Sequence, residues 1–172
     1  MTTVHTTQGP VDTDPVDTDP VDTDPADLWP AFTTHTADDV AVGAVRLTRL
    51  VAWCDTPSVH TAHAVLPGTG GQPSDVESAS VVVARVVAVE WRSDLRMHVL
   101  IDADLRGCAP FVAAARVIGR AATVHLSAAT LSCAAAGQEA GIPLRLPSDV
   151  VMGDLVVVPC AGATYLRDVA VA

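Results

Sequence analysis

Few residues in this chain of 172 could do chemistry, and the thiol of Cys133 is the first candidate. Cysteine acts as a nucleophile or metal ligand when a neighbouring cation or histidine stabilises its thiolate. The residues beside Cys133 are Ser132 and Ala134, so the local sequence favours a buried structural thiol over a reactive one. The cysteines are widely spaced and no two form a CxxC pair, so we expect free thiols rather than disulfides. The cysteines are Cys54, Cys108, Cys133 and Cys160.

Two histidines, His60 and His63, stand three residues apart. On a helical turn they would share a face and could bind zinc together with a third ligand. On a strand the same spacing places them on opposite faces. Residues 59–66 are typical of a strand, so we expect no metal site there. His35, His98 and His125 are expected to be polar residues at strand edges.

Two other groups resemble functional motifs but favour a structural interpretation. Asp102 and Asp104 share a face at the end of a predicted strand and could form a carboxylate pair, yet the nearby Arg106 favours a local ion pair in a solvated turn. Residues 68–71 (GTGG) lack the lysine and the following helix of a phosphate-binding loop, so we expect a turn.

The segment of residues 153–165, GDLVVVPCAGATY, contains a more distinctive order. A Gly-Asp turn enters a run of valines, the run stops at Pro159, and a small-residue corner begins at Gly162. Tyr165, the only tyrosine of the chain, follows this corner. The order predicts a tight turn, a buried strand and a second corner.

This order resembles the last barrel strand of the C-terminal domain of the pyridoxal-phosphate-dependent ornithine/diaminopimelate/arginine decarboxylases. The resemblance extends over residues 72–165 as an ordered series of short motifs. The positions that carry it are 72–75 (QPSD), 83–89 (VARVVAV), 99–104 (VLIDAD), 109–111 (APF), Cys133, 146–147 (LP), 153–154 (GD) and 162–165 (GATY). It implies a mainly β domain similar to that of the alanine racemases.

The resemblance also implies roles for three residues. In the family the cysteine is a proton donor near the cofactor, and the Gly-Ala-Tyr corner reaches the cofactor phosphate. Cys133 would then be catalytic, and Gly162 and Tyr165 would bind the cofactor. Residues near these positions depart from the family: Ala134 replaces the acid after the cysteine, and Tyr165 is displaced by one position, which on a strand turns a side chain to the opposite face.

The chain contains no lysine, because all ten of its basic residues are arginine. A Schiff base with pyridoxal phosphate requires a side-chain primary amine, which arginine does not supply. The chain therefore needs a separate barrel subunit with a lysine if it is to serve such an enzyme.

The first residues differ in composition from the rest. Residues 11–25 are three copies of Val-Asp-Thr-Asp-Pro, and the first thirty residues contain seven aspartates and no basic residue. Proline and like-charge repulsion favour an extended, solvated arm over residues 1–38, with a folded domain over residues 39–172. Calcium binding by the aspartates is not favoured, because no glycine-turned loop gathers them.

The folded part shows short β-branched runs separated by Gly/Pro turns. Strands are predicted within residues 40–53, 59–66, 80–91, 97–102, 121–126, 144–146 and 155–158, and a helical turn or strand within 113–120. Residues 80–91 and 97–102 are expected to form a hairpin, with a polar turn at residues 92–94 between them. We therefore expect a small β-barrel or sandwich with one or two short helices. The alanine clusters are the positions at which a helix could replace a strand.

The sequence leads to three functional hypotheses. The first is a free-standing, diverged decarboxylase C-terminal-like domain, a pseudoenzyme that pairs with a separate barrel protein or with itself. The second is a subunit of a split amino-acid decarboxylase, and the third is an unrelated β-barrel that binds a small ligand. The net charge of −10 argues against nucleic-acid binding. The absence of a signal peptide or an apolar span predicts a cytoplasmic protein that does not contact membranes.

Overall fold

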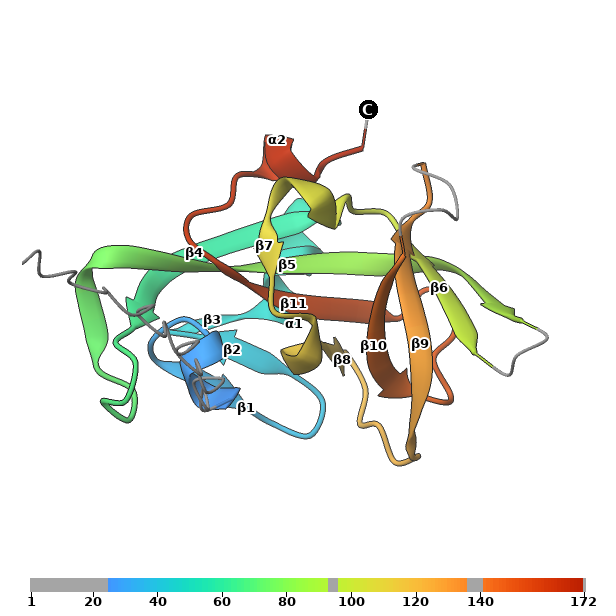
Figure 1. Cartoon of the computed structure of the whole chain (residues 1–172), viewed down its shortest axis with the longest axis horizontal. Coiled ribbons are helices and arrows are strands. Elements are labelled where there is room, and N and C mark those ends of the chain that lie inside the picture. Colours follow the sequence, from blue (N-terminus) through green and yellow to red (C-terminus); the bar gives the residue numbers. More distant parts are fainter. Residues whose placement is uncertain (1–24, 93–95, 136–140, 172) are drawn as a thin grey trace, which may run out of the picture.

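A single long strand, β5 (Pro73–Trp91), organises the fold (Figure 1). The computed structural model describes residues 25–92, 96–135 and 141–171. On one side of β5, β4 (Ser58–Val65) pairs with its first half and β6 (Met97–Ile101) with its second half. On the other side lies β11 (Leu155–Ala161). The mainly β fold class is confirmed.

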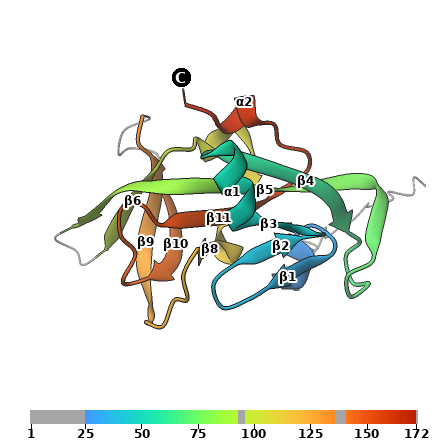
Figure 2. The same ribbon diagram turned by 180° about the vertical axis from the view of Figure 1, so that it is seen from behind.

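The sheet curls into a half-barrel. β6 continues in parallel to β9 (Leu126–Cys133), which pairs with β10 (Ile142–Pro147). At the opposite end, β11 pairs with β7 (Ala109–Pro110) and β8 (Arg116–Ile118). Figures 1 and 2 show β9 and β10 crossing the direction of β5 and β11, so that β10 comes back beside β8.

The barrel does not close. Among the described residues no ladder joins β10 to β8, although the two strands lie near each other. A short 3-10 turn, η3 (Val112–Ala114), leads into β8 and lies beside β10 as well. We call this unpaired gap between β10 and η3–β8 the seam.

The valine run of β5 has no polar alternation because both of its faces are buried. Val82, Ala84 and Val86 point into the half-barrel core, whereas Val81 and Val83 pack into a second core on the other face. Trp29, Val40 and Leu47 are among the residues that cover this second face. Burial on both sides explains why this segment gave the clearest strand prediction.

The second core is built by an N-terminal subdomain of three short strands and a helix. Its elements are β1 (Thr33–His35), β2 (Val40–Val42), β3 (Val45–Arg46) and α1 (Leu47–Cys54). The prediction of strands throughout residues 40–53 was therefore wrong beyond Arg46. Leu47 and Val51 are four residues apart, and this spacing puts both on one helical face against the core.

The carboxylate of Asp39 holds the start of α1. It accepts hydrogen bonds from the Thr48 hydroxyl (2.6 Å), the Thr48 backbone N–H (3.3 Å) and Arg46 Nε (2.9 Å). The Asp39 side chain is 2% exposed, so these donors are what makes its burial tolerable. A side chain outside the predicted strand thus decides where the helix begins.

Other boundaries also differ from the predictions. Residues 25–38, which were predicted to belong to the arm, form η1 (Pro25–Leu28) and β1 and bury Trp29, whereas residues 1–24 lie outside the described part. Residues 121–126 form a connection until β9 starts at Leu126, and residues 113–120 contain both a 3-10 turn and a strand. The last helix, α2 (Leu166–Val169), has four residues. In the described part of the chain, no helix has the length and apolarity that a membrane crossing requires.

Candidate functional site

Cys133 lies at the end of β9, opposite Ile101 of β6, and is half-buried. The fold brings Arg106 close enough to interact electrostatically with this thiol. The sequence around Cys133 gave no sign of this cation. Arg106 is, however, engaged by Asp104, whose carboxylate accepts its Nη2 at 2.6 Å and its Nε at 2.9 Å. A catalytic role for Cys133 stays a prediction.

Gly162 and Tyr165 lie just beyond β11, in a corner fastened to β5. Ser80 Oγ donates to the Gly162 carbonyl (2.9 Å) and accepts from the Thr164 backbone N–H (2.9 Å). Tyr165 is 56% exposed at the start of α2, and the Arg167 guanidinium lies 4.8 Å from the centre of its ring. The side-chain reversal that a slip within a strand would cause does not apply, because Tyr165 is outside the strand.

A pocket of about 290 Å³ opens beside Gly162, and its walls include the carboxylates of Asp27 and Glu77. Acidic walls favour a cation over a phosphate group. The chain also supplies no lysine for a Schiff base with pyridoxal phosphate. No hydrogen bond or ion pair joins Cys133 to Gly162 or Tyr165 in the described part of the chain. Cofactor binding by Gly162 and Tyr165 stays a prediction.

The structure places the residues of the possible metal motif on a strand and those of the possible carboxylate motif in the turn after β6. His60 and His63 lie on strand β4, and His63 Nδ1 is 2.8 Å from the Ser74 carbonyl oxygen. Asp102 accepts hydrogen bonds from Thr56 Oγ1 (2.6 Å) and the Arg85 backbone N–H (2.7 Å), while Asp104 pairs with Arg106. Within residues 25–92, 96–135 and 141–171, no group of three potential metal ligands occurs.

His98 differs from its prediction as an edge residue. It lies in β6, an interior strand of the sheet, and is 1% exposed. Its Nε2 is 3.0 Å from Ser132 Oγ on the neighbouring strand β9, and its Nδ1 is 4.0 Å from Glu90 Oε2. Because β6 was predicted as one arm of a two-stranded hairpin, the parallel addition of β9 that buries this histidine was not foreseen.

The larger pocket, of about 510 Å³, lies in the seam, and we call it the seam pocket. A volume of this size is within the range of small-molecule sites. Most of its wall is apolar or small, and two arginines are the only charged residues that the described part of the chain contributes to it. Its lining consists of Ala37, Val112, Ala113, Ala115, Arg116, Val117, Ala122, Leu126, Pro143, Leu144, Arg145 and Pro147.

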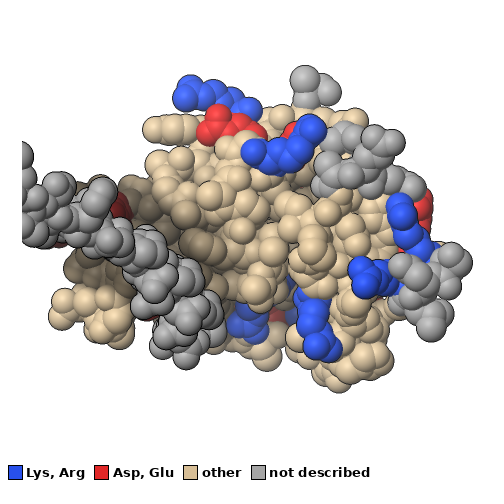
Figure 3. Space-filling model, viewed as in Figure 1, with Lys and Arg blue, Asp and Glu red and all other residues tan. Residues whose placement is uncertain are grey.

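The two arginines come from opposite sides of the seam. Arg116 belongs to β8 and donates from Nη2 to the Thr36 carbonyl (3.5 Å), and Arg145 belongs to β10 and donates from Nη2 to the Leu126 carbonyl (3.0 Å). Neither guanidinium has a carboxylate partner among the described residues, whereas Arg46, Arg85 and Arg120 each pair with aspartate. Figure 3 shows arginine side chains low on a mostly uncharged face, over the region where β10 descends beside β8 in Figure 1.

Arg116 acts electrostatically on His35, beside the pocket wall. Burial lowers the pKa of His35, and the positive charge of Arg116 lowers it further. His35 lies in β1, two residues before Ala37 of the pocket wall. A neutral imidazole beside an unpaired guanidinium leaves the arginine charge available to an anion.

The outer edge of β10 is poorly suited to pairing with a further strand across the seam. Pro143 and Pro147 stand at both ends of β10 and have no backbone N–H. A strand added at this edge would find no hydrogen-bond donor at either position, which is why proline is typical of edge strands. The seam is therefore better suited to a small molecule than to a peptide in β-conformation.

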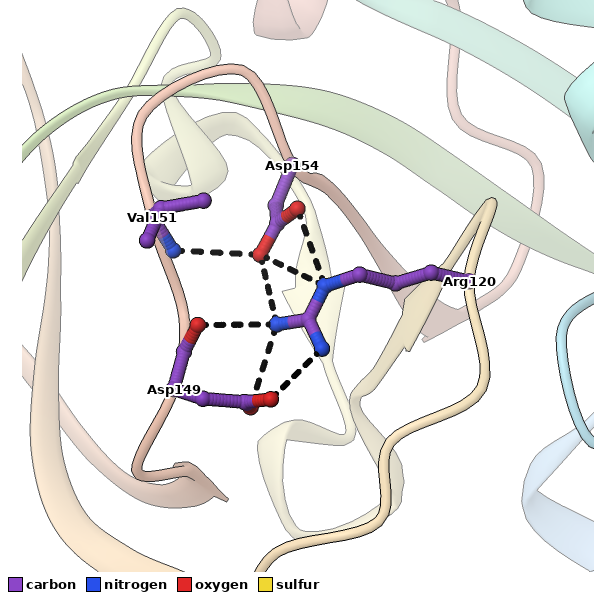
Figure 4. Close-up of polar contacts among 4 residues, drawn as sticks. All are labelled: Arg120, Asp149, Val151 and Asp154. Carbon is purple, nitrogen blue, oxygen red and sulfur yellow. Dashed lines mark hydrogen bonds and ion pairs between the residues drawn. The ribbon is translucent and has the colours of Figure 1, made fainter.

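A partly buried ion cluster joins the connection between β8 and β9 to the connection between β10 and β11 (Figure 4). Arg120, just after β8, donates to Asp149 (Nη1–Oδ2, 2.8 Å) and to Asp154 (Nη2–Oδ2, 2.8 Å). Asp154 also accepts the Val151 backbone N–H (3.1 Å), so the turn between β10 and β11 is tied to the chain that leads to Ala122 of the pocket wall. Asp154, noted in the sequence only as part of a turn, thus helps to position the seam.

Comparisons with known proteins are sparse for this chain. No protein-family model matches it, and no curated protein matches it. Among solved structures, it is similar to the arginine decarboxylase of Paramecium bursaria Chlorella virus, determined with bound agmatine, with a TM-score of 0.39 and 14% identity. That decarboxylase belongs to the family that the sequence resembles. The similarity is distant and partial, since it covers 54% of this chain and 28% of the decarboxylase chain.

Proposed function

We propose that this protein is a binding domain whose seam pocket takes a small amphipathic anion. The observation that carries the proposal is that Arg116 and Arg145, two arginines without a carboxylate partner in the described part, line the same apolar pocket. Guanidinium groups bind carboxylates and phosphates through directional, charge-assisted hydrogen bonds. The alanines and prolines of the wall would cover an aliphatic body of the ligand.

Calorimetric titration with three eight-carbon probes tests this function. Octanoate and octyl phosphate carry the two candidate head groups, and octanol has the same tail without charge. We expect the better of the two anions to bind with a Kd on the order of 0.1–1 mM at low salt, and octanol at least about tenfold more weakly. The ranking of the two anions identifies the head group.

Variants identify the site. Arg116→Met and Arg145→Met should each weaken anion binding by about tenfold, the effect of losing one charge-assisted hydrogen bond. Arg167→Met, on the exposed helix α2, is the matched control and should leave binding unchanged. Equal binding of octanol and the anions, or equal effects of all three variants, would refute the proposal.

The ordered residue series in positions 72–165 favours a second function. We propose as the alternative that the chain is a decarboxylase C-terminal-like domain, not catalytic alone, which pairs with a separate pyridoxal-phosphate barrel protein or with itself. In support, the Gly153–Asp154 turn leads into a strand, β11, that pairs with the valine-rich β5. A version of this proposal makes the chain one subunit of a split decarboxylase, with the lysine supplied by its partner.

Sedimentation measurements on the chain alone and mixed with a barrel-only pyridoxal-phosphate protein test the pairing. A self-associating chain, or a heavier species formed only on mixing, supports it, and a monomer that ignores the barrel protein contradicts it. For the split enzyme, decarboxylation should appear on mixing and fall in Cys133→Ala. Unchanged activity in Cys133→Ala would eliminate that version.

A further inference from the structure

The fold brings two of the four cysteines into contact. Cys160 lies in β11 and is completely buried, and Cys108 lies just before β7 and is half-buried. Their sulfur atoms are 3.4 Å apart. The pairing of Cys160 with Pro110 in the β11–β7 ladder places Cys108 next to Cys160 through the backbone. The contact is thus a consequence of the strand register.

We propose that Cys108 and Cys160 form a reversible disulfide when the protein meets a peroxide. The Cys108 thiolate attacks one oxygen of hydrogen peroxide, the O–O bond breaks, and hydroxide leaves as a sulfenic acid forms. The Cys160 sulfur then attacks the sulfenic sulfur, the S–O bond breaks, and the Cys160 proton leaves with that oxygen as water. In total, two thiols and one peroxide yield one disulfide and two waters.

The surroundings assign the two roles. The hydrogen bond from the Cys160 thiol to the Cys108 sulfur lowers the pKa of Cys108, against the opposing effects of burial and of Asp104 and Asp168. The same contact, together with burial, raises the pKa of Cys160. Cys108 is the more accessible of the two and is therefore the thiol that peroxide reaches first, while Cys160 resolves the sulfenic acid.

Closing the bond requires a modest local movement. A disulfide has an S–S distance of about 2.05 Å, so the sulfurs must approach by about 1.4 Å. Cys160 is held in a core strand, but Cys108 lies between η2 (Leu105–Gly107) and β7, two short elements. We therefore expect Cys108 and the segment between η2 and β7 to move toward Cys160. This segment continues into the η3–β8 side of the seam. The disulfide forms independently of any ligand in the seam pocket.

Peptide mapping of the intact protein tests the disulfide directly. Cleavage after arginine places each cysteine in a different peptide: 50–85 for Cys54, 107–116 for Cys108, 121–145 for Cys133 and 146–167 for Cys160. After one equivalent of hydrogen peroxide and blocking of free thiols, we expect peptide 107–116 linked to peptide 146–167. Dithiothreitol should restore four free thiols.

Two variants and one internal control complete the test. In Cys160→Ala the link should vanish and Cys108 should become trapped as a sulfenic acid by dimedone, whereas in Cys108→Ser the buried Cys160 should stay reduced. Cys54 and Cys133 are the internal controls and should remain blockable. A link that involves Cys54 or Cys133, or overoxidation of Cys108 without a link in the unsubstituted protein, would overturn the proposal.

Discussion

Replacing Arg120 by methionine should lower the free energy of unfolding by about 2 kcal/mol. Arg120 makes six hydrogen bonds to Asp149 and Asp154. Asp149 is 38% exposed, so solvent screens its share, but Asp154 is 11% exposed and would lose the only cation that pairs with it among the described residues. The contact between Arg120 and Asp154 therefore accounts for most of the expected loss in unfolding free energy.

Urea unfolding, followed by circular dichroism, measures the effect. The midpoint should fall by about 1 M if the slope has the value usual for a small domain. Arg120→Lys should lie between the unsubstituted protein and Arg120→Met, because an ammonium retains the charge but cannot bridge two carboxylates as a fork.

Arg106→Met is the matched control. Arg106 also makes a short ion pair with an aspartate, Asp104, but its side chain is 60% exposed and its partner is only two residues away. We expect a midpoint indistinguishable from that of the unsubstituted protein. Equal shifts of the midpoint in Arg120→Met and Arg106→Met would refute this explanation. They would mean that neither burial nor the link between distant segments makes the Arg120 ion pairs more stabilising than an exposed local pair.

Two further predictions concern Asp39 and Gly107. Burial by itself would raise the pKa of Asp39, but hydrogen bonds from Thr48, Val40 and Arg46 together hold it below 3.8. Its contribution to stability is therefore complete above the unfolded-state pKa and is lost as the pH falls through the lower folded-state pKa. In urea unfolding measured at a series of pH values, Asp39→Asn should be less stable than the unsubstituted protein at pH 7 and should lose less stability as the pH falls. An unchanged loss of stability in acid would contradict the assignment. Gly107→Ala should lower the free energy of unfolding by about 1–3 kcal/mol, because the added methyl group would collide with the Asp168 backbone carbonyl. If thermal unfolding of this variant matched that of the unsubstituted protein, α2 would not be held against η2.

The site residues show which inferences a sequence can support. The zero-lysine count excludes a Schiff base on this chain from composition alone. The roles of Cys133, Gly162 and Tyr165 stay predictions, because a resemblance transfers positions in order but not their surroundings. No local sequence pattern indicates the seam pocket. Arg116 and Arg145 are 29 residues apart in the sequence and line one pocket only because the curled sheet brings β8 beside β10.

Local patterns by themselves determined the β class, the β5–β6 hairpin and the turn before β11, because alternation, β-branched runs and glycine turns act over a few neighbouring residues. Tertiary structure decided what depends on distant partners. The helix α1 begins where Asp39 can hold Thr48, and His98 is buried because β9 adds in parallel. Cys108 meets Cys160 only through the β7–β11 register. Such contacts arise from strand order, which no short window of sequence contains.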